Sequence, residues 1–250
     1  MLMVSQEPAR LLALEVPSNP DDLCVPELQA GSVHVWHAGL PVTGSQPELF
    51  ENLLSSDEAA RRARFHFESD RRDFASARGL LRTLLAAYCG RDPRELRFRY
   101  SERGKPSLAG PGSDEGLQFN LSHTRGAILL GICRGRAVGV DIEKVREDFR
   151  PQEIAARFFS DAEQQALSSL PEAERRQAFF RCWTRKEAFL KARGDGLSFP
   201  LERFDVSIGG EAEVRLTTRP DPAEAERWQI VEAQAPEGYA AAVAAATELG

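Results

Sequence analysis

Two carboxylates stand at alternate positions in the segment 138–143, with valine and isoleucine at the positions between them. Alternation with a period of two predicts a β-strand that holds Asp141 and Glu143 on one face, about 7 Å apart. Two like charges this close repel each other unless a cation lies nearby, and Mg²⁺ prefers carboxylate, phosphate and water oxygens. The pair therefore predicts a site for a hard divalent cation, and Gly139 on the same face predicts room for a ligand.

A third carboxylate and an ammonium group stand four residues apart in a helix expected from about residue 171 to 192, with Ser169 as its N-cap. Residues at this spacing are neighbours on a helix surface, so Glu187 and Lys191 share one face. Lys186 falls on the apolar face, which is unusual for a charge that is neither paired nor bound. We expect it to point into the site. The alternative is an amphipathic helix with an ordinary surface pair.

Together the two segments resemble the signature motifs of the 4'-phosphopantetheinyl transferases, GxDIE and WTxKEAxLKxxGxGL. Here they read GVDIE at 139–143 and WTRKEAFLKARGDGL at 183–197. Their spacing and the chain length are similar to those of the larger, surfactin-synthetase-activating type, not of the short trimeric type. The resemblance implies an α+β fold, a pseudo-dimer of two similar α+β modules with one active site at their junction.

The implied reaction moves the 4'-phosphopantetheine arm of coenzyme A to a serine of an apo acyl or peptidyl carrier protein. Adenosine 3',5'-bisphosphate is released. Under this resemblance Asp141, Glu143 and Glu187 hold Mg²⁺, for which Mn²⁺ can substitute. Glu187 is also the expected general base, directly or through a metal-bound water, and Lys191 neutralises the pyrophosphate together with Lys186. The carriers served would belong to polyketide, nonribosomal-peptide or fatty-acid synthases.

Two helices expected at about 55–67 and 69–89 carry many arginines and few acids. A ligand with several phosphates would need such a concentration of positive charge, whereas the alternatives are a solvated helix face or local ion pairs. The arginines are Arg61, Arg62, Arg64, Arg71, Arg72, Arg78 and Arg82. In the family, basic residues of the first helix bind the 3'-phosphate of the coenzyme. Arg61 fills one such position, but Glu58 stands where another cation is often found.

Two further family motifs follow, GKP at 104–106 and FNLSH at 119–123. Both contribute to the coenzyme A pocket of the family. The resemblance therefore implies that Lys105, Ser122 and His123 lie near the adenosine 3'-phosphate end of the coenzyme.

The order of elements is the same in the two halves of the chain: a strand, a set of helices, then several short strands. The division falls near Gly135, giving an N-terminal module at 1–135 and a C-terminal module at 136–250. The last strands are expected at 204–208, 212–217, 228–233 and 239–244, the first two as a hairpin. Because both modules are present in one chain, we expect a monomer.

Composition excludes several classes of protein. The 250 residues are 42% hydrophobic, enough for a substantial core, and the net charge of -6 argues against general nucleic-acid binding. No apolar run nears the length of a membrane span, which predicts a cytoplasmic protein without a membrane partner. His34 and His37 lie in a strand-like context that does not form a helical metal-ligand pair. Two rival functions remain, a Mg²⁺-dependent nucleotide pyrophosphatase or phosphatase and a non-catalytic module that binds coenzyme A or a carrier protein.

Overall fold

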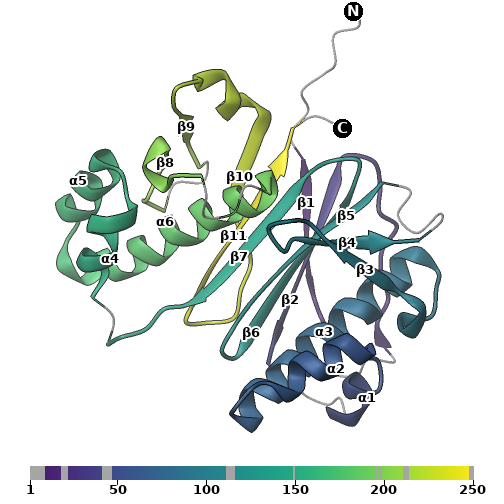
Figure 1. Cartoon of the computed structure of the whole chain (residues 1–250). Coiled ribbons are helices and arrows are strands. Elements are labelled where there is room, and N and C mark those ends of the chain that lie inside the picture. Colours follow the sequence, from purple (N-terminus) through teal and green to yellow (C-terminus); the bar gives the residue numbers. More distant parts are fainter. Residues whose placement is uncertain are drawn as a thin grey trace, which may run out of the picture.

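The computed structural model describes residues 9–17, 22–40, 47–110, 116–148, 150–194, 196, 199–210 and 214–247. Helices and mixed sheets combine into an α+β fold, as expected (Figure 1). None of the helices in these ranges has the length and apolarity of a membrane span.

A four-stranded sheet in the order β1-β2-β6-β5 forms the centre of the N-terminal half. Its strands are β1 (Arg10–Glu15), β2 (Ser32–Gly39), β5 (Leu117–Thr124) and β6 (Ala127–Arg134). The helices of this half are α1 (Pro47–Glu51), α2 (Ser56–Ala63) and α3 (Glu68–Cys89). A separate antiparallel pair, β3 (Arg97–Tyr100) and β4 (Pro106–Ala109), lies beside the sheet.

A three-stranded sheet in the order β10-β11-β7 forms the centre of the C-terminal half. Its strands are β7 (Val138–Lys144), β10 (Trp228–Glu232) and β11 (Tyr239–Ala246). The helices are α4 (Pro151–Phe158), α5 (Asp161–Ser169) and α6 (Glu172–Arg193), and β8 (Phe204–Val206) pairs with β9 (Leu216–Thr218). The order β10-β11-β7 repeats the order β5-β6-β2 of the first half.

The inner faces of the two sheets share one hydrophobic core, in which Val33 and Val35 of β2 lie with Val138, Val140 and Ile142 of β7. Alternate residues of each strand face the other way, toward helices. The helix α3 lies on the outer face of the first sheet and α6 on the outer face of the second (Figure 1). Their apolar side chains pack with those of the sheet that each helix covers. The alternation read from the sequence therefore decides which side chains of β7 meet α6.

Three elements differ from what the sequence predicts. The strand β1 is not predicted, because this edge strand has one neighbour and leaves Leu12 40% exposed, without a clean alternation of apolar residues. Ser169 does not cap α6; its hydroxyl donates to Ala166 O at 2.7 Å within α5, and Pro171 takes the N-cap position. Of the strand expected at 212–217, residues 212 and 213 lie outside the described residues, residues 214 and 215 are not in a strand, and β9 begins at Leu216. The hairpin pairing of β8 with β9 is confirmed.

Candidate active site

A carboxylate, a hydroxyl and an ammonium group meet where the two halves of the chain join. Lys191 Nζ on α6 donates to Asp141 Oδ1 on β7 at 2.6 Å and to Ser122 Oγ on β5 at 2.9 Å. Ser122 Oγ donates in turn to Asp141 Oδ1 at 2.9 Å. Asp141 is only 4% exposed. The strand β5 of one half and the β7–α6 crossing of the other therefore build this centre together.

Close approach of α6 to β7 depends on Gly139. A Cβ atom there would lie 2.2 Å from Ala188 O and from Ala192 N, both main-chain atoms of α6. The expectation that Gly139 leaves room for a ligand is wrong, because the helix backbone fills that space. The absence of a side chain at Gly139 instead lets α6 pack close to β7. Glu187 and Lys191 of α6 therefore lie beside the strand that contains Asp141 and Glu143.

The two other expected carboxylates lie within electrostatic range of this centre. Burial, and then the charge of Asp141, raises the pKa of Glu143, while Lys191 opposes the shift. The same causes, in the same order, raise the pKa of Glu187 to about 7. Because the charge of Asp141 contributes to both shifts and that of Lys191 opposes both, these three carboxylates and Lys191 lie in one region.

Two oxygens at the centre indicate what this region can bind. Asp141 Oδ2 and Glu187 Oε1 are buried and have no hydrogen-bond partner among the described residues. Buried acceptors without partners are unfavourable, and carboxylate oxygens are the ligands that hard divalent cations prefer. Within the same ranges no three such side chains converge as a complete metal-ligand group. The donor chemistry fits a divalent cation, and its binding would require the three carboxylates to move together.

The sequence reasoning missed two residues that hold the carboxylate strand in place. Asn120 Oδ1 accepts a hydrogen bond from Val140 N at 2.9 Å, and Thr124 Oγ1 donates to Glu143 Oε2 at 3.5 Å. A signal was present, because Asn120, Ser122 and Thr124 are polar residues at alternate positions of β5. This period places them on one face, opposite Asp141 and Glu143.

Lys105 reaches this site from the other half of the chain. Its Nζ donates to the main-chain oxygens of Lys191 at 2.6 Å, Ala192 at 3.2 Å and Val138 at 3.3 Å. These bonds place the ammonium at the C-terminal end of α6. Ser122 likewise bonds to Asp141 and Lys191, and not to the arginines of α2 and α3.

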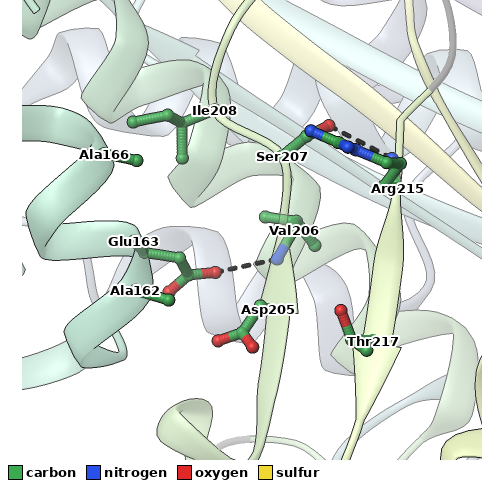
Figure 2. A pocket seen from close by; sticks show the side chains of 9 residues that line it. All are labelled: Ala162, Glu163, Ala166, Asp205, Val206, Ser207, Ile208, Arg215 and Thr217. Carbon is green, nitrogen blue, oxygen red and sulfur yellow. Dashed lines mark hydrogen bonds between the residues drawn. The ribbon is translucent and has the colours of Figure 1, made fainter.

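Lys186 does not point into the site, contrary to expectation. It is fully buried, and its Nζ donates to both carboxylate oxygens of Glu163 and to Phe204 O, each at 2.7 Å. Glu163 also accepts Val206 N at 2.9 Å, as Figure 2 shows. The apolar position of Lys186 is thus explained by a buried ion pair that ties α5 and β8 to α6. The cavity of about 360 Å³ beside Glu163 contains none of the expected site residues.

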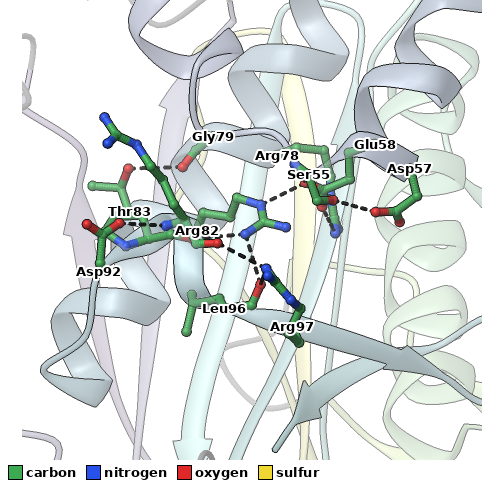
Figure 3. Close-up of polar contacts among 12 residues, drawn as sticks. Ser55, Asp57, Glu58, Arg78, Gly79, Arg82, Thr83, Asp92, Leu96 and Arg97 are labelled. Atoms are coloured by element: carbon green, nitrogen blue, oxygen red, sulfur yellow. Dashed lines mark hydrogen bonds and ion pairs between the residues drawn. The ribbon is translucent and has the colours of Figure 1, made fainter.

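Glu58, an acidic residue among the arginines of α2 and α3, belongs to a buried cluster of ion pairs. Glu58 on α2, 3% exposed, accepts hydrogen bonds from Arg78 Nε at 2.8 Å and Arg82 Nε at 2.7 Å, both on α3 (Figure 3). Burial alone would raise the pKa of Glu58, but Arg78 and Arg82 lower it overall. These two arginines therefore belong to a local ion-pair network, the alternative left open by the sequence.

Arg61 and His123 lie within electrostatic range of each other. Arg61 borders a cavity of about 210 Å³ with Phe74 and Tyr100, and its guanidinium lies 5.5 Å from the Phe74 ring centroid. Desolvation, and then the charges of Lys191 and Arg61, lowers the pKa of His123, although the residue is exposed. His123 is thus within electrostatic range of both Lys191 and the α2–α3 arginines.

Comparison with known proteins identifies the family. Residues 137–244 match the family described as "4'-phosphopantetheinyl transferase superfamily", and residues 43–131 match "4'-phosphopantetheinyl transferase, N-terminal". The 4'-phosphopantetheinyl transferase HetI of Nostoc sp. is 38% identical over 88% of this chain and 90% of its own length. The transferase Sfp of Bacillus subtilis is 29% identical over 82% and 88%, and psf-1 of Bacillus pumilus is 33% identical over 74% and 78%. The chain therefore belongs to the 4'-phosphopantetheinyl transferase superfamily, whose members transfer phosphopantetheine from coenzyme A to carrier proteins, generally with a divalent metal.

Proposed function

We propose that this chain modifies a serine of an apo acyl or peptidyl carrier protein with coenzyme A as donor and Mg²⁺ as the metal. The observation that carries the proposal is the contact of Lys191, Asp141 and Ser122, together with two buried carboxylate oxygens that have no hydrogen-bond partner among the described residues. Asp141, Glu143 and Glu187 would hold the metal. When bound, the metal would neutralise charge on the pyrophosphate oxygens.

The serine Oγ attacks the phosphorus on the pantetheine side of the pyrophosphate. A new O–P bond forms, the bridging O–P bond breaks, and adenosine 3',5'-bisphosphate leaves. The serine proton goes to a Glu187 carboxylate oxygen, directly or through a water molecule. Lys191 supplies positive charge to the phosphoryl oxygens as negative charge grows on them.

The coenzyme would extend from this centre toward α2 and α3. His123 and Arg61 lie in that direction and are proposed to contact its 3'-phosphate. Arg78 and Arg82 are not proposed as phosphate ligands, because both guanidinium groups are already bonded to Glu58. Carriers of polyketide, nonribosomal-peptide and fatty-acid synthases are the proposed substrates.

Lys191→Ala tests the assigned centre. Loss of an electrostatic contact with the transition state costs about 10²–10³ in rate, so kcat should fall by this factor. Carrier modification is followed by mass spectrometry with purified enzyme, coenzyme A, Mg²⁺ and an apo carrier. The matched control is Lys144→Ala, an exposed lysine at the end of β7, which should retain full activity. A Lys191→Ala enzyme with normal kcat would remove Lys191 from the mechanism.

Metal and partner dependence are tested in the same assay. Chelation should abolish modification, and Mg²⁺ or Mn²⁺ should restore it; full activity in excess chelator would refute the metal assignment. Cleavage of coenzyme A without any carrier would favour the pyrophosphatase instead. Light scattering should give one chain of 27.7 kDa, since one chain supplies both halves of the centre.

A further inference from the structure

The last turn of α6 needs hydrogen-bond donors from outside the helix. The final carbonyls of any α-helix lack partners within it and carry partial negative charge. Gly194, in the left-handed conformation at φ 80°, satisfies only Leu190 O, at 3.0 Å. The carbonyls of Lys191 and Ala192 are instead bonded by Lys105 Nζ, which comes from the opposite half of the chain.

All three N–H groups of Lys105 are committed to main-chain oxygens. The third bond goes to Val138 O, at the start of β7 and one residue before Gly139. The ammonium group of Lys105 therefore joins the beginning of β7 to the end of α6. A phosphate could bind Lys105 only by breaking bonds that α6 needs.

The turn that carries Lys105 is itself fixed. Ser101 N donates to Lys105 O at 3.0 Å, and Lys105 N donates to Ser101 Oγ at 3.1 Å. Gly104, at φ 79°, closes the turn by donating to Ser101 O at 2.8 Å. The side chain of Lys105 thus extends from a turn that is held by hydrogen bonds. This suits a residue that holds another element in position.

We propose that Lys105 is a positioning residue: by bonding the carbonyls of Lys191 and Ala192 it fixes the backbone from which Lys191 reaches Asp141 and Ser122. The inference rests on the role proposed for Lys191. It differs from the expectation that Lys105 binds the 3'-phosphate. The two roles predict different kinetics.

Lys105→Met keeps the aliphatic stem and removes the donors. Displacement of a catalytic group by about 1 Å can cost up to about 10² in rate, so we expect kcat to fall between about 10-fold and 10²-fold. The ratio of kcat/KM for coenzyme A to kcat/KM for 3'-dephospho-coenzyme A should stay at the wild-type value. Arg97→Met is the matched control, because Arg97 also bonds main-chain oxygens, those of Arg94 and Leu96, but far from α6. It should keep the wild-type kcat.

A double-mutant cycle separates positioning from general loss of structure. In the Lys191→Ala background, Lys105→Met should cause no further fall in kcat, because the group that it positions is already absent. An additive fall would show that Lys105 acts through the fold as a whole and would overturn the inference. Loss of the preference for the 3'-phosphate in Lys105→Met would also overturn it, in favour of direct phosphate binding. If Lys191→Ala alone is fully active, the proposed role of Lys191 fails first, and this inference fails with it.

Discussion

Replacing Gly139 of β7 by alanine should push α6 away from β7. The new Cβ would lie 2.2 Å from two main-chain atoms of α6, and ordinary contact begins at 3.4 Å. Relief of this overlap requires about 1.2 Å of movement between β7 and α6. Main-chain atoms inside a helix cannot turn aside as the end of a side chain can, so the whole turn must move.

The rate and the stability should both fall, because a 10²-fold loss of rate corresponds to about 2.7 kcal/mol. Overpacking of a dense core typically costs about 1–3 kcal/mol in the free energy of unfolding. A shift of about 1 Å at a reacting group can cost about 10² in rate. Because Glu187 and Lys191 stand on the turn that moves, we expect kcat to fall about 10²-fold in a Gly139→Ala protein that still folds.

The assay is the initial rate of carrier modification, measured by mass spectrometry beside urea unfolding of the same preparations. Gly39→Ala is the control, because the nearest atom to its Cβ would be Gly126 O at 3.9 Å, which leaves room for a methyl group. It should change neither kcat nor stability. A Gly139→Ala enzyme with wild-type kcat would refute the argument that the β7–α6 contact sets the position of the catalytic groups.

Two further predictions concern the N-terminal half. Glu58→Gln leaves the buried guanidinium groups of Arg78 and Arg82 without their counter-charge, so urea unfolding should show a loss of about 3–5 kcal/mol. A change under about 0.5 kcal/mol, as expected for the exposed control Glu153→Gln, would contradict the network. Burial lowers the pKa of His34, whose Nδ1 lies 2.6 Å from Tyr88 Oη, so the unfolded chain binds a proton more readily than the folded protein does. Wild type should therefore lose stability relative to His34→Gln as pH falls below about 6.5, and a pH-independent difference between their unfolding free energies would refute this.

The sequence predicted the face on which a site side chain lies wherever that face depends only on the strand or helix to which the residue belongs. The alternation around Asp141 and the four-residue spacing of Glu187 and Lys191 predicted their faces, and β7 and α6 have those faces. Partners from distant parts of the chain were not readable. Lys186 finds Glu163, which is 23 positions away in the sequence, and no local pattern indicates that pairing.

Gly139 is another residue whose contact partner the sequence alone does not identify. A glycine in a strand indicates close approach of something, and the sequence does not say whether a ligand or another backbone comes near. In the fold the answer is α6. Similarly, β1 owes its place to pairing with β2 and not to any alternation of its own, so that it could not be recognised from residues 10–15 alone.

The repeated order of strands places a second strand–helix crossing, β2 against α3, at the position that corresponds to β7 against α6. There Tyr88 Oη accepts from Trp36 Nε1 at 2.9 Å and lies 2.6 Å from His34 Nδ1, so aromatic and imidazole groups satisfy one another inside the protein. At the other crossing, the buried oxygens Asp141 Oδ2 and Glu187 Oε1 have no hydrogen-bond partner among the described residues. The polar side chains of the first crossing therefore bond to one another, whereas under the proposed function the carboxylates of the second are available to a ligand. Carboxylates placed on this face of β2 would have to replace His34 or Trp36, and Tyr88 Oη would then lose the partners that it has inside the protein.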